Sequence, residues 1–574
     1  MSDAFDHVVD VLVIGSGGGG MTAALAADAA GLDTLVVEKG SRFGGSTALS
    51  GGGIWVPGAP AQRREGYSPL PDGVFEYLKQ ITDGLVTDAR LRQYVDGAPK
   101  MMEFLETISG WFEFVWKPGY ADYYPEQPGG SALGSTINVP AIDLRKLGDK
   151  EEHLLQPLAL APKGIWLGPK DLRLFYQVRQ NWRGKAVLVK LVWRMFRARA
   201  FGDRMAAIGQ SLAARLRLAM ADRGIPLWLD SPMTELITDA DGAVTGAVVE
   251  RDGSTQRIGA RCGVILATGG FDHDMAWRRQ YLPELQKDWS FGNLLSMGDG
   301  IRAGEKVGAS TDLLDEAWWF PAIQWPDGRL QFMLNERMMP SQFVVNGSGE
   351  RFINEAAPYM DFAHAMIAGQ RSGITHIPCW LITDIRSFHR YVVAGHLPIP
   401  KVPFAPVPTG WKVPPSWLDS GVVHEGHSFT ELAGKIGVPA DALVRTAQRF
   451  NALARTGHDD DFNRGDSVYD NYYGDPTLPN PNLHPLTKPP YYAFQIILGD
   501  LGTSGGLRTD EYARVVRDDD TVVKGLYAVG NTSAAVMGRS YAGAGATIGP
   551  AMTFGYVAAQ HIAAAVDSHR KVSK

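Results

Sequence analysis

Four residues near the start of the chain have the types and spacing needed to bind a dinucleotide. Gly15, Gly17 and Gly20 form a G-x-G-x-x-G fingerprint, in which the first glycine permits a tight turn and the third lets a helix pack closely. The second glycine lets a pyrophosphate approach the backbone. Glu38 follows at the distance where a carboxylate accepts the ribose hydroxyls. The chemistry predicted here is the binding of a dinucleotide cofactor.

The flanking sequence predicts the strand, helix and second strand that this fingerprint requires. Residues 9–14 are a nearly continuous β-branched run, as expected for a strand covered by helices on both faces. A helix is predicted over residues 21–30, with its amide dipoles facing the phosphates. A second strand is predicted over residues 34–37, directly before Glu38. The fold class expected is therefore α/β, with a Rossmann-like domain at the start of the chain.

A glycine-rich loop and a short buried strand supply further candidate contacts to the nucleotide. Residues 39–53 contain too many glycines for regular structure, and their small hydroxyls Ser46 and Thr47 can donate to phosphate or isoalloxazine oxygens. Residues 263–271 read as a buried strand that ends in a small-residue turn. No second G-x-G-x-x-G that could seat NAD follows, so the sequence predicts one nucleotide site.

The C-terminal part of the chain indicates that this nucleotide is FAD. Residues 525–531 predict a strand and a turn, and a helix is expected over residues 551–566 with Pro550 at its first turn. The positive end of that helix would face the flavin pyrimidine and favour the anionic reduced form, which NAD chemistry does not need. Because no histidine lies near residues 42–53, we expect FAD to be bound noncovalently.

Composition excludes several other classes of function. The chain has 574 residues, of which 45% are hydrophobic, so it can bury a large core and form two or more domains. The net charge of −6 gives no reason to expect nucleic acid as a partner, and two cysteines are too few for a disulfide framework or a metal cage. With no hydrophobic signal core and no apolar run of about 18 to 20 residues, a cytoplasmic location is expected.

Residues 163–204 depart from this acidic background. They carry many lysines and arginines but only two acidic residues, and tryptophans lie between the cations. Apolar residues at helical spacing form one face beneath a basic one: Leu188, Leu191, Val192, Met195 and Phe196. This pattern favours a helix that lies in the membrane interface, at the inner face of the cell membrane. The alternative is a helix packed on its own protein with a solvated basic face.

The middle of the chain reads as an inserted domain without a metal site. From about residue 289 to residue 490 the alternation of strands and helices is lost, which indicates an insertion of the α+β type. The acidic stretch 459–466 lacks the terminal glutamate of a calcium loop. His424 and His427 could pair on a metal, but no further ligands lie near them in the sequence. No metal is therefore assigned.

Four motifs in a fixed order are more specific than the glycine fingerprint. They are DYYPEQPGG at 122–130, NEAAPY at 354–359, GDLGTSGG at 499–506 and SYAGAGATIGPAMTFG at 540–555. With the dinucleotide fold and the inserted domain, they resemble the 3-ketosteroid Δ1-dehydrogenases, a branch of the fumarate reductase and succinate dehydrogenase flavoprotein family. The resemblance covers nearly the whole chain and implies a Rossmann-like FAD-binding domain with an inserted α+β catalytic, or capping, domain.

One departure from the parent family concerns the substrate. Dicarboxylate-reducing members carry a histidine just before the glycine pair that corresponds to Gly505 and Gly506, whereas this chain has Ser504. A fumarate site also needs convergent cations to hold two carboxylates, and the matching positions here are tyrosine and glycine. The resemblance therefore implies a pocket for a largely apolar ketone.

The resemblance assigns catalytic roles to four residues. The Tyr541 hydroxyl and the Gly545 backbone N–H would hydrogen-bond the C3 carbonyl and stabilise the developing enolate, as an oxyanion hole does. Tyr359 would remove the C2 proton with support from Tyr123, and the hydride would pass from C1 to flavin N5. Because Tyr124 is adjacent, the supporting phenol could be either of the two. A phenol with its usual pKa of about 10 is a poor base, so Tyr359 needs a hydrogen-bonded partner and a favourable field.

The residues expected to bind FAD come from the segments described above. They are Gly15, Gly17, Gly20, Glu38, Lys39, Gly45, Ser46, Thr47, Ala267, Thr268, Gly269, Gly530, Asn531, Gly545 and Ile548. The expected division places the FAD-binding domain over residues 1–285 and 493–574, interrupted by the catalytic domain over residues 286–492.

The resemblance implies FAD-dependent 1,2-dehydrogenation of 3-ketosteroids, with the electrons passing to a quinone or a similar acceptor. Contact of residues 163–204 with the membrane would suit this activity, because sterols and quinones both partition into lipid. One alternative is a related enzyme that desaturates the 4,5 bond or reduces another conjugated ketone. An alternative of another class is a non-catalytic, membrane-recruited, sterol-binding flavoprotein.

Overall fold

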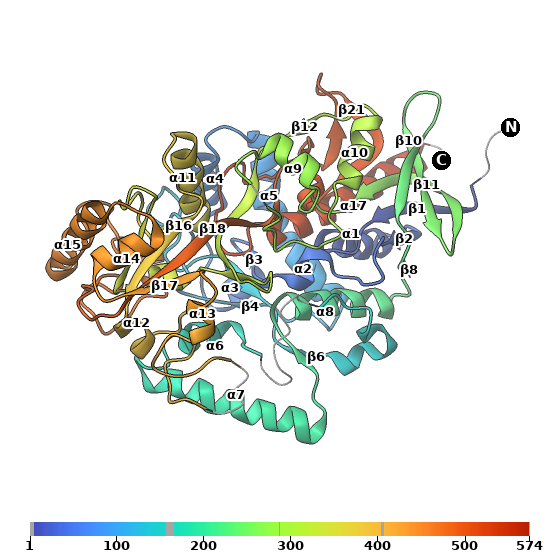
Figure 1. The fold of residues 1–574 in the computed structure, drawn as a ribbon. Helices are drawn as coiled ribbons and strands as arrows, with labels where there is room; N and C mark the ends of the chain where they lie inside the picture. Colours follow the sequence, from blue (N-terminus) through green and yellow to red (C-terminus); the bar gives the residue numbers. More distant parts are fainter. Residues whose placement is uncertain (1–4, 157–165, 286, 403–406, 573–574) are drawn as a thin grey trace.

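The computed structural model describes residues 5–156, 166–285, 287–402 and 407–572. Two β-sheets organise these residues, one of eight strands and one of six. In Figure 1 the eight-stranded sheet lies on the right, near both chain ends, and the six-stranded sheet lies on the left. This arrangement confirms the predicted α/β fold with an inserted capping region.

Strand β1 (His7–Ile14) lies at the centre of the eight-stranded sheet. It pairs in parallel with β11 (Ser254–Leu266) on one side and with β2 (Thr34–Val37) on the other. The remaining strands are β8 (Leu227–Trp228), β9 (Met233–Thr238), β10 (Val244–Arg251), β20 (Arg514–Val516) and β21 (Val522–Ala528). Every residue from Val11 to Val13 is fully buried, so β1 is covered on both faces as its β-branched run predicts.

Two helices from opposite ends of the sequence pack together beside this sheet. Helix α1 (Gly18–Ala29) follows β1, and it contacts α17 (Ile548–Val572), the last helix of the chain. Both predicted helices are present, but they begin at Gly18 and Ile548 rather than at residues 21 and 551. The first turn of a helix accepts glycine and proline, because its amide groups have no intrahelical partner. The helices therefore begin earlier than expected, closer to the strand and the turn that precede them.

The six-stranded sheet is antiparallel, and five of its six strands lie within the region predicted as an insertion. Its strands are β13 (Ala317–Gln324), β14 (Leu330–Phe332), β15 (Gln342–Val345), β16 (Cys379–Asp384), β17 (Val423–Gly426) and β18 (Tyr491–Thr503). Strand β18 pairs with β13, β16 and β17. It crosses residue 492, where one predicted domain boundary falls, and the domain division itself stays a prediction.

Helices cover this sheet on the left of Figure 1. Helices α14 (Phe429–Ile436) and α15 (Ala440–Thr456) pack on β15 and β16 through one hydrophobic cluster. Helix α11 (Tyr359–Arg371) contacts β13. Since α11 begins at Tyr359, the sheet and its helices determine where that side chain lies.

Short elements connect the two sheets. Three small sheets are formed by β3 (Ile54–Trp55) with β5 (Thr136–Asn138) and β4 (Val115–Trp116), by β6 (Ile142–Asp143) with β7 (Met205–Ala206), and by β12 (Thr311–Asp312) with β19 (Gly506–Leu507). The other α-helices are α2 (Gly45–Leu49), α3 (Pro60–Arg64), α4 (Pro71–Thr82), α5 (Asp88–Ile108), α8 (Ile208–Asp222), α9 (Met275–Tyr281), α10 (Asp299–Lys306), α12 (Ile385–Arg390), α13 (Pro415–Leu418) and α16 (Val468–Asn471).

The basic segment forms two helices at the lower edge of the molecule in Figure 1. They are α6 (Pro169–Tyr176) and α7 (Trp182–Phe201), which confirms the predicted helical spacing between residues 188 and 196. The first residues of the predicted segment, 163–165, lie outside the described part of the chain. Among the residues that the structure does describe, no helix is both long enough and apolar enough to cross a bilayer.

A buried cluster of charges fixes the segment that leads into α11. The Glu355 carboxylate accepts from Arg351 at 2.8 Å and from Arg464 at 3.0 Å, and Glu355 and Arg464 have no exposed side-chain surface. Arg351 also pairs with Asp459 at 2.6 Å. Burial raises the pKa of Glu355, but the charges of Arg351 and Arg464 outweigh it and hold that pKa below its usual value. Because Tyr359 follows directly in the chain, this cluster fixes the start of α11.

We expect Glu355→Gln to destabilise the protein by about 3 to 5 kcal/mol, because it leaves two buried guanidinium groups with one carboxylate fewer. Thermal or denaturant unfolding of the two proteins measures the difference. Glu350→Gln is the matched control, since Glu350 belongs to the same loop and is exposed. Equal stability of Glu355→Gln and wild type would contradict the structural role of the cluster.

Candidate active site

The glycines of the fingerprint have the three different surroundings that dinucleotide binding requires. Gly15 has a φ of +110°, and a Cβ there would lie 2.2 Å from the Ala267 carbonyl oxygen. A Cβ on Gly20 would lie 2.1 Å from the Gly15 carbonyl oxygen. A Cβ on Gly17 would meet no atom within 4 Å. Gly15 and Gly20 are therefore needed for packing, whereas Gly17 faces open space that a pyrophosphate could fill.

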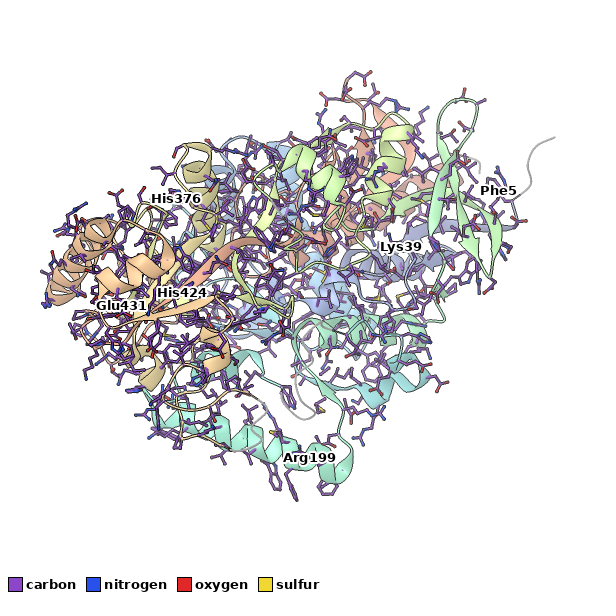
Figure 2. All side chains as sticks on the ribbon, viewed as in Figure 1. Phe5, Lys39, Arg199, His376, His424 and Glu431 are labelled. Carbon is purple, nitrogen blue, oxygen red and sulfur yellow. The ribbon has the colours of Figure 1, made fainter. Side chains whose placement is uncertain are left out.

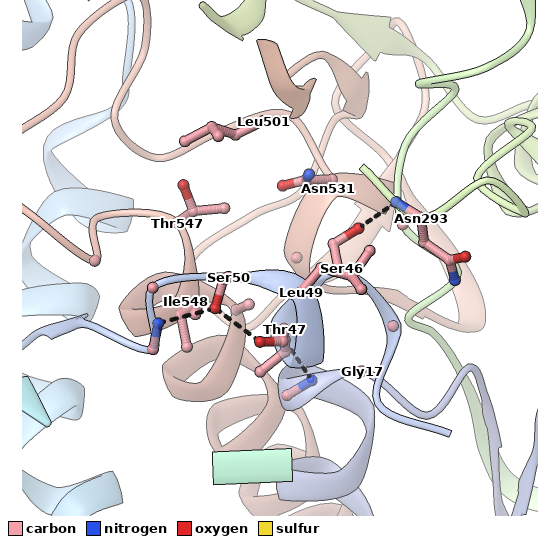
Figure 3. Close-up of a pocket in the computed structure, with 18 of the residues that line it drawn as sticks. Gly17, Ser46, Thr47, Leu49, Ser50, Asn293, Leu501, Asn531, Thr547 and Ile548 are labelled. Atoms are coloured by element: carbon pink, nitrogen blue, oxygen red, sulfur yellow. Dashed lines mark hydrogen bonds between the residues drawn. The ribbon is translucent and has the colours of Figure 1, made fainter. Parts of the chain in front are cut away.

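The first turn of α1 faces the segment that contains Ser46 and Thr47. The sequence predicts irregular structure here, but residues 45–49 form the short helix α2, because Gly44 and Gly45 both have positive φ and reverse the chain. Thr47 accepts a hydrogen bond from the Gly18 amide at 3.0 Å, and Ser46 accepts one from the Asn293 amide at 3.0 Å. Figure 3 shows both hydroxyls on α2, above the start of α1. Their own protons stay available for a cofactor.

Glu38 ends the second strand with both carboxylate oxygens held in place. One oxygen accepts from the Ser16 amide at 3.0 Å and from the Ser16 hydroxyl at 2.6 Å, and the other accepts from the Gly40 amide at 2.9 Å. Lys39 forms an ion pair with Asp299 at 2.5 Å. The oxygen that accepts from Gly40 has a second lone pair free, so Glu38 stays able to bind a ribose hydroxyl.

One cavity of about 540 Å³ collects the predicted site residues. All fifteen residues expected to bind FAD and all four expected catalytic residues line it: Gly15, Gly17, Gly20, Glu38, Lys39, Gly45, Ser46, Thr47, Tyr123, Ala267, Thr268, Gly269, Tyr359, Gly530, Asn531, Tyr541, Gly545 and Ile548, with Gly545 in both sets. Their individual roles stay predictions. Within the described residues, no three His, Cys, Asp or Glu side chains are grouped so that they could hold a metal ion.

Three tyrosines from distant parts of the chain meet in this cavity. The ring centroids of Tyr123 and Tyr359 lie 5.3 Å apart, those of Tyr123 and Tyr541 5.5 Å, and those of Tyr359 and Tyr541 5.2 Å. All three side chains are buried. They come from the loop after β4, from the first residue of α11 and from the loop before α17. The fold thus joins phenols that no local sequence pattern brings together.

The Tyr541 hydroxyl and the Gly545 amide lie next to one another in the lining of the cavity. Burial raises the pKa of Tyr541, and hydrogen bonds from Thr547, Tyr359 and the Gly545 amide act against that effect. The Thr547 hydroxyl donates to the Tyr541 oxygen at 3.1 Å. Thr136 donates to the Ala544 carbonyl at 2.9 Å. In a trans peptide the N–H points away from the preceding C=O, so the Gly545 N–H points away from Thr136. With its oxygen accepting, Tyr541 keeps its own proton to donate.

The Tyr359 phenol lies at the positive end of a helix. It is the first residue of α11, directly after Pro358. Burial raises its pKa well above the usual value, as does the neighbouring Tyr541, while a hydrogen bond with Tyr123 acts in the opposite direction. The helix N-terminus favours the phenolate. Pro358 precedes the first helical turn, where the missing N–H of proline costs no intrahelical hydrogen bond.

The structure distinguishes Tyr123 from Tyr124. Tyr123 lines the cavity, whereas Tyr124 does not. The Tyr124 hydroxyl donates to the Asp361 carboxylate of α11 at 2.8 Å. Of the two adjacent phenols, Tyr123 is thus the one that faces the other catalytic candidates.

Asp122 is a positioning residue that the sequence reasoning missed. It is buried, and its carboxylate accepts from the Trp55 indole at 2.8 Å and from the amides of Ser135 and Ser131 at 3.1 and 3.2 Å. Burial raises the pKa of Asp122 to about 7. Its position directly before Tyr123 was the only local signal, because its partners lie elsewhere in the sequence.

Comparison with known proteins agrees with this site. The FAD binding domain family matches residues 10–548. The chain is 42% identical over 565 residues to the 3-oxosteroid 1-dehydrogenase of Mycobacterium tuberculosis, covering 96% of this chain and 98% of that relative. It is 41% identical over 573 residues to the 3-oxosteroid 1-dehydrogenase of Mycolicibacterium smegmatis, covering 98% of both.

A solved structure is similar over its whole length. It is the 3-ketosteroid Δ1-dehydrogenase from Sterolibacterium denitrificans in complex with 1,4-androstadiene-3,17-dione, with a TM-score of 0.88 and 38% sequence identity. The match covers 97% of this chain and 100% of that one. The family match and this neighbour confirm the prediction that the cofactor is FAD.

We expect Gly17→Val to abolish FAD binding without unfolding the protein, because its side chain would enter space that is open in the protein alone. Absorbance of the purified protein near the flavin bands and the melting temperature of the apoprotein measure the two effects. Gly110→Val is the control, since a Cβ there also meets no atom within 4 Å and Gly110 lies outside the cavity. A yellow Gly17→Val protein with wild-type flavin content would refute the assignment of Gly17.

Proposed function

Because the chain belongs to the FAD-binding family that includes the 3-oxosteroid 1-dehydrogenases, we propose that it catalyses the 1,2-dehydrogenation of 3-ketosteroids. The observation that supports this function is the convergence of Tyr541, Gly545, Tyr359 and Tyr123 in the cavity lined by the FAD-binding residues. A ketone needs hydrogen-bond donors at its oxygen and a base beside the neighbouring carbon, and this set of residues offers both.

In the proposed mechanism, Tyr541 and Gly545 bind the C3 carbonyl. The Tyr541 oxygen already accepts from Thr547, so its own proton is free to donate to the ketone oxygen. The Gly545 N–H is the second donor. As the C2 proton leaves, negative charge develops on the ketone oxygen, and the two donors stabilise it without reorganising. Acidification of C2 thus comes from a phenol and a backbone amide.

Tyr359 takes the C2 proton in this mechanism, and Tyr123 stabilises the phenolate by donating to it. The start of α11 adds a favourable field at the same oxygen. FAD held by the fingerprint glycines, Ser46 and Thr47 would supply the acceptor for a hydride from C1. The buried aromatic surroundings exclude water from both steps.

Tyr359→Phe should slow anaerobic flavin reduction by androst-4-ene-3,17-dione by about 10² to 10⁴-fold, because the base is lost. Tyr541→Phe should slow it by about 10² to 10³-fold, because one donor to the oxyanion is lost. Stopped-flow absorbance measures both rates. The exposed Tyr512 provides the control Tyr512→Phe, and flavin content should be unchanged in all three. Full activity in Tyr359→Phe would show that Tyr359 is not the base.

In the wild type the rate of flavin reduction should rise with pH, because burial raises the pKa of Tyr359 and only its deprotonated form accepts the proton.

The same experiment separates the alternatives. A 4(5)-dehydrogenase would instead desaturate 5α-androstane-3,17-dione to a 4-ene product and leave androst-4-ene-3,17-dione unchanged. A non-catalytic sterol-binding flavoprotein would bind either steroid without bleaching the flavin.

We further propose that α7 lies on a membrane surface, from which a quinone-like acceptor takes the electrons. One face of α7 is buried through Val187, Leu191 and Ala198. The other face leaves an apolar row exposed at helical spacing: Trp182 at 73%, Val189 at 71%, Trp193 at 58% and Phe196 at 56%. Of the residues expected on one apolar face, Leu191 is buried whereas Val192 and Phe196 are exposed, so α7 has apolar residues on two faces.

Cations flank the exposed apolar row of α7. Arg183, Lys185, Arg197 and Arg199 are all exposed, and Figure 2 shows Arg199 near the end of the helix at the edge of the molecule. Aromatic side chains with neighbouring arginines suit the headgroup region of an anionic bilayer. The segment therefore offers a peripheral contact for an otherwise acidic protein.

Replacing Trp182, Trp193 and Phe196 together by serine should weaken binding to vesicles of phosphatidylglycerol and phosphatidylcholine by about tenfold or more. Co-sedimentation of the protein with the vesicles measures the affinity. Leu70→Ser is the control, because Leu70 is 77% exposed and lies outside the basic segment. Wild-type protein that stays in the supernatant at low salt would exclude this membrane contact.

A further inference from the structure

Two cations lie against stacked tyrosines in the region of the cavity beyond the catalytic tyrosines. The Lys117 ammonium lies 4.5 Å from the ring centroid of Tyr120 and 5.4 Å from that of Tyr472. The Arg173 guanidinium lies 4.7 Å from the Tyr472 centroid. Tyr120 and Tyr472 stack with centroids 4.4 Å apart. Lys117 and Tyr120 both line the cavity, so the ammonium is within reach of a bound molecule.

No carboxylate compensates these two charges within the described part of the chain. Within the described residues, the Lys117 ammonium lies over the rings of Tyr120 and Tyr472. Burial, followed by the charge of Arg173, lowers the pKa of Lys117 to about 8. The Arg173 Nε is buried without a hydrogen-bond partner. Two like charges in a buried site are unfavourable unless an anion joins them. The arrangement is therefore suited to receive an anion.

The position of Lys117 relative to the catalytic tyrosines points to one end of a long substrate. The Tyr123 ring contacts Tyr541, where the ketone would bind, and Tyr120 interacts with Tyr123 on the side toward Lys117. Apolar side chains line the same cavity: Phe291, Phe320, Phe332 and Leu334. The cavity thus has hydrogen-bond donors for a ketone, an apolar wall for a ring system, and a cation displaced from the ketone site.

We propose that Lys117, with Arg173 behind it, binds the carboxylate of an acidic side chain on the substrate, so that the preferred substrates are 3-ketosteroid acids. This inference rests on the proposed function of the same cavity. The ammonium donates a charge-assisted hydrogen bond to the carboxylate, and the anion offsets the repulsion between the two cations. Lys117 is then a specificity-determining residue that leaves the chemistry at C1 and C2 untouched.

The experiment compares a matched pair of substrates, 3-oxochol-4-en-24-oate and its methyl ester, with an artificial dye as electron acceptor. In Lys117→Met, KM for the acid should rise by about tenfold or more, while KM for the ester and kcat for both stay within about twofold. Lys117→Arg should retain most of the preference for the acid, because it keeps the charge. Lys146→Met is the control for loss of a lysine, since Lys146 is exposed and packs over Trp111 outside the cavity.

The outcomes separate this inference from the proposed function. A wild type that uses the ester as well as the acid, or a Lys117→Met protein that loses both equally, would overturn the carboxylate site. Equal melting temperature and flavin content of the variants exclude a structural role for Lys117. Should the wild type oxidise neither steroid, the proposed function fails, and the anion site is then judged by binding. Titrations followed by flavin absorbance must give a higher affinity for the acid than for the ester, and Lys117→Met must remove that difference.

Discussion

The site depends on how one glycine-rich loop is held. Residues 542–546, AGAGA, have little side-chain mass of their own, and ordering their glycines costs conformational entropy. Three carbonyls of the loop are each held by a different segment: Ala542 accepts from the Tyr123 amide at 3.0 Å, Ala544 from Thr136 at 2.9 Å and Gly545 from the Trp55 amide at 3.1 Å. These bonds hold the loop so that both Tyr541 and Gly545 line the cavity.

The same anchors connect this glycine-rich loop to the N-terminal part of the chain. Asp122 bonds the Trp55 indole, and Trp55 in turn bonds Gly545 through its backbone. A Cβ on Gly545 would lie 2.4 Å from the Gly53 carbonyl carbon, so only glycine allows this close approach. Tyr359 reaches the site from the start of α11, which packs on β13 and follows the buried charges around Glu355. The geometry of the proposed proton transfer therefore depends on contacts among segments that are distant in the sequence.

Sequence reasoning succeeded where the interactions are local and needed a resemblance where they are not. The turn at Gly15, Gly17 and Gly20 could be predicted because strand, turn and helix are contiguous. The three tyrosines come from three distant segments, so only the family motifs indicated that they meet. Asp122 and Thr136 were missed because Trp55 and Ala544, which they bind, are distant in sequence. Lys117 lies over the nearby Tyr120 as well as the distant Tyr472, and its one local signal was a cation inside the apolar run 114–120.

The basic segment connects the proposed membrane contact with the proposed carboxylate site. Asp171 of α6 binds Lys190 and Arg194 of α7, each at 3.0 Å, so the two helices are fixed to one another. Helix α6 also carries Arg173, over the tyrosine stack, and Tyr176, which lines the cavity. Helix α7, proposed to lie on lipid, is thus held to α6, which carries Arg173 over Tyr472. An amphiphilic steroid lies at a bilayer surface with its charged group toward water, and this insertion would receive such a molecule with a cation in place for that group.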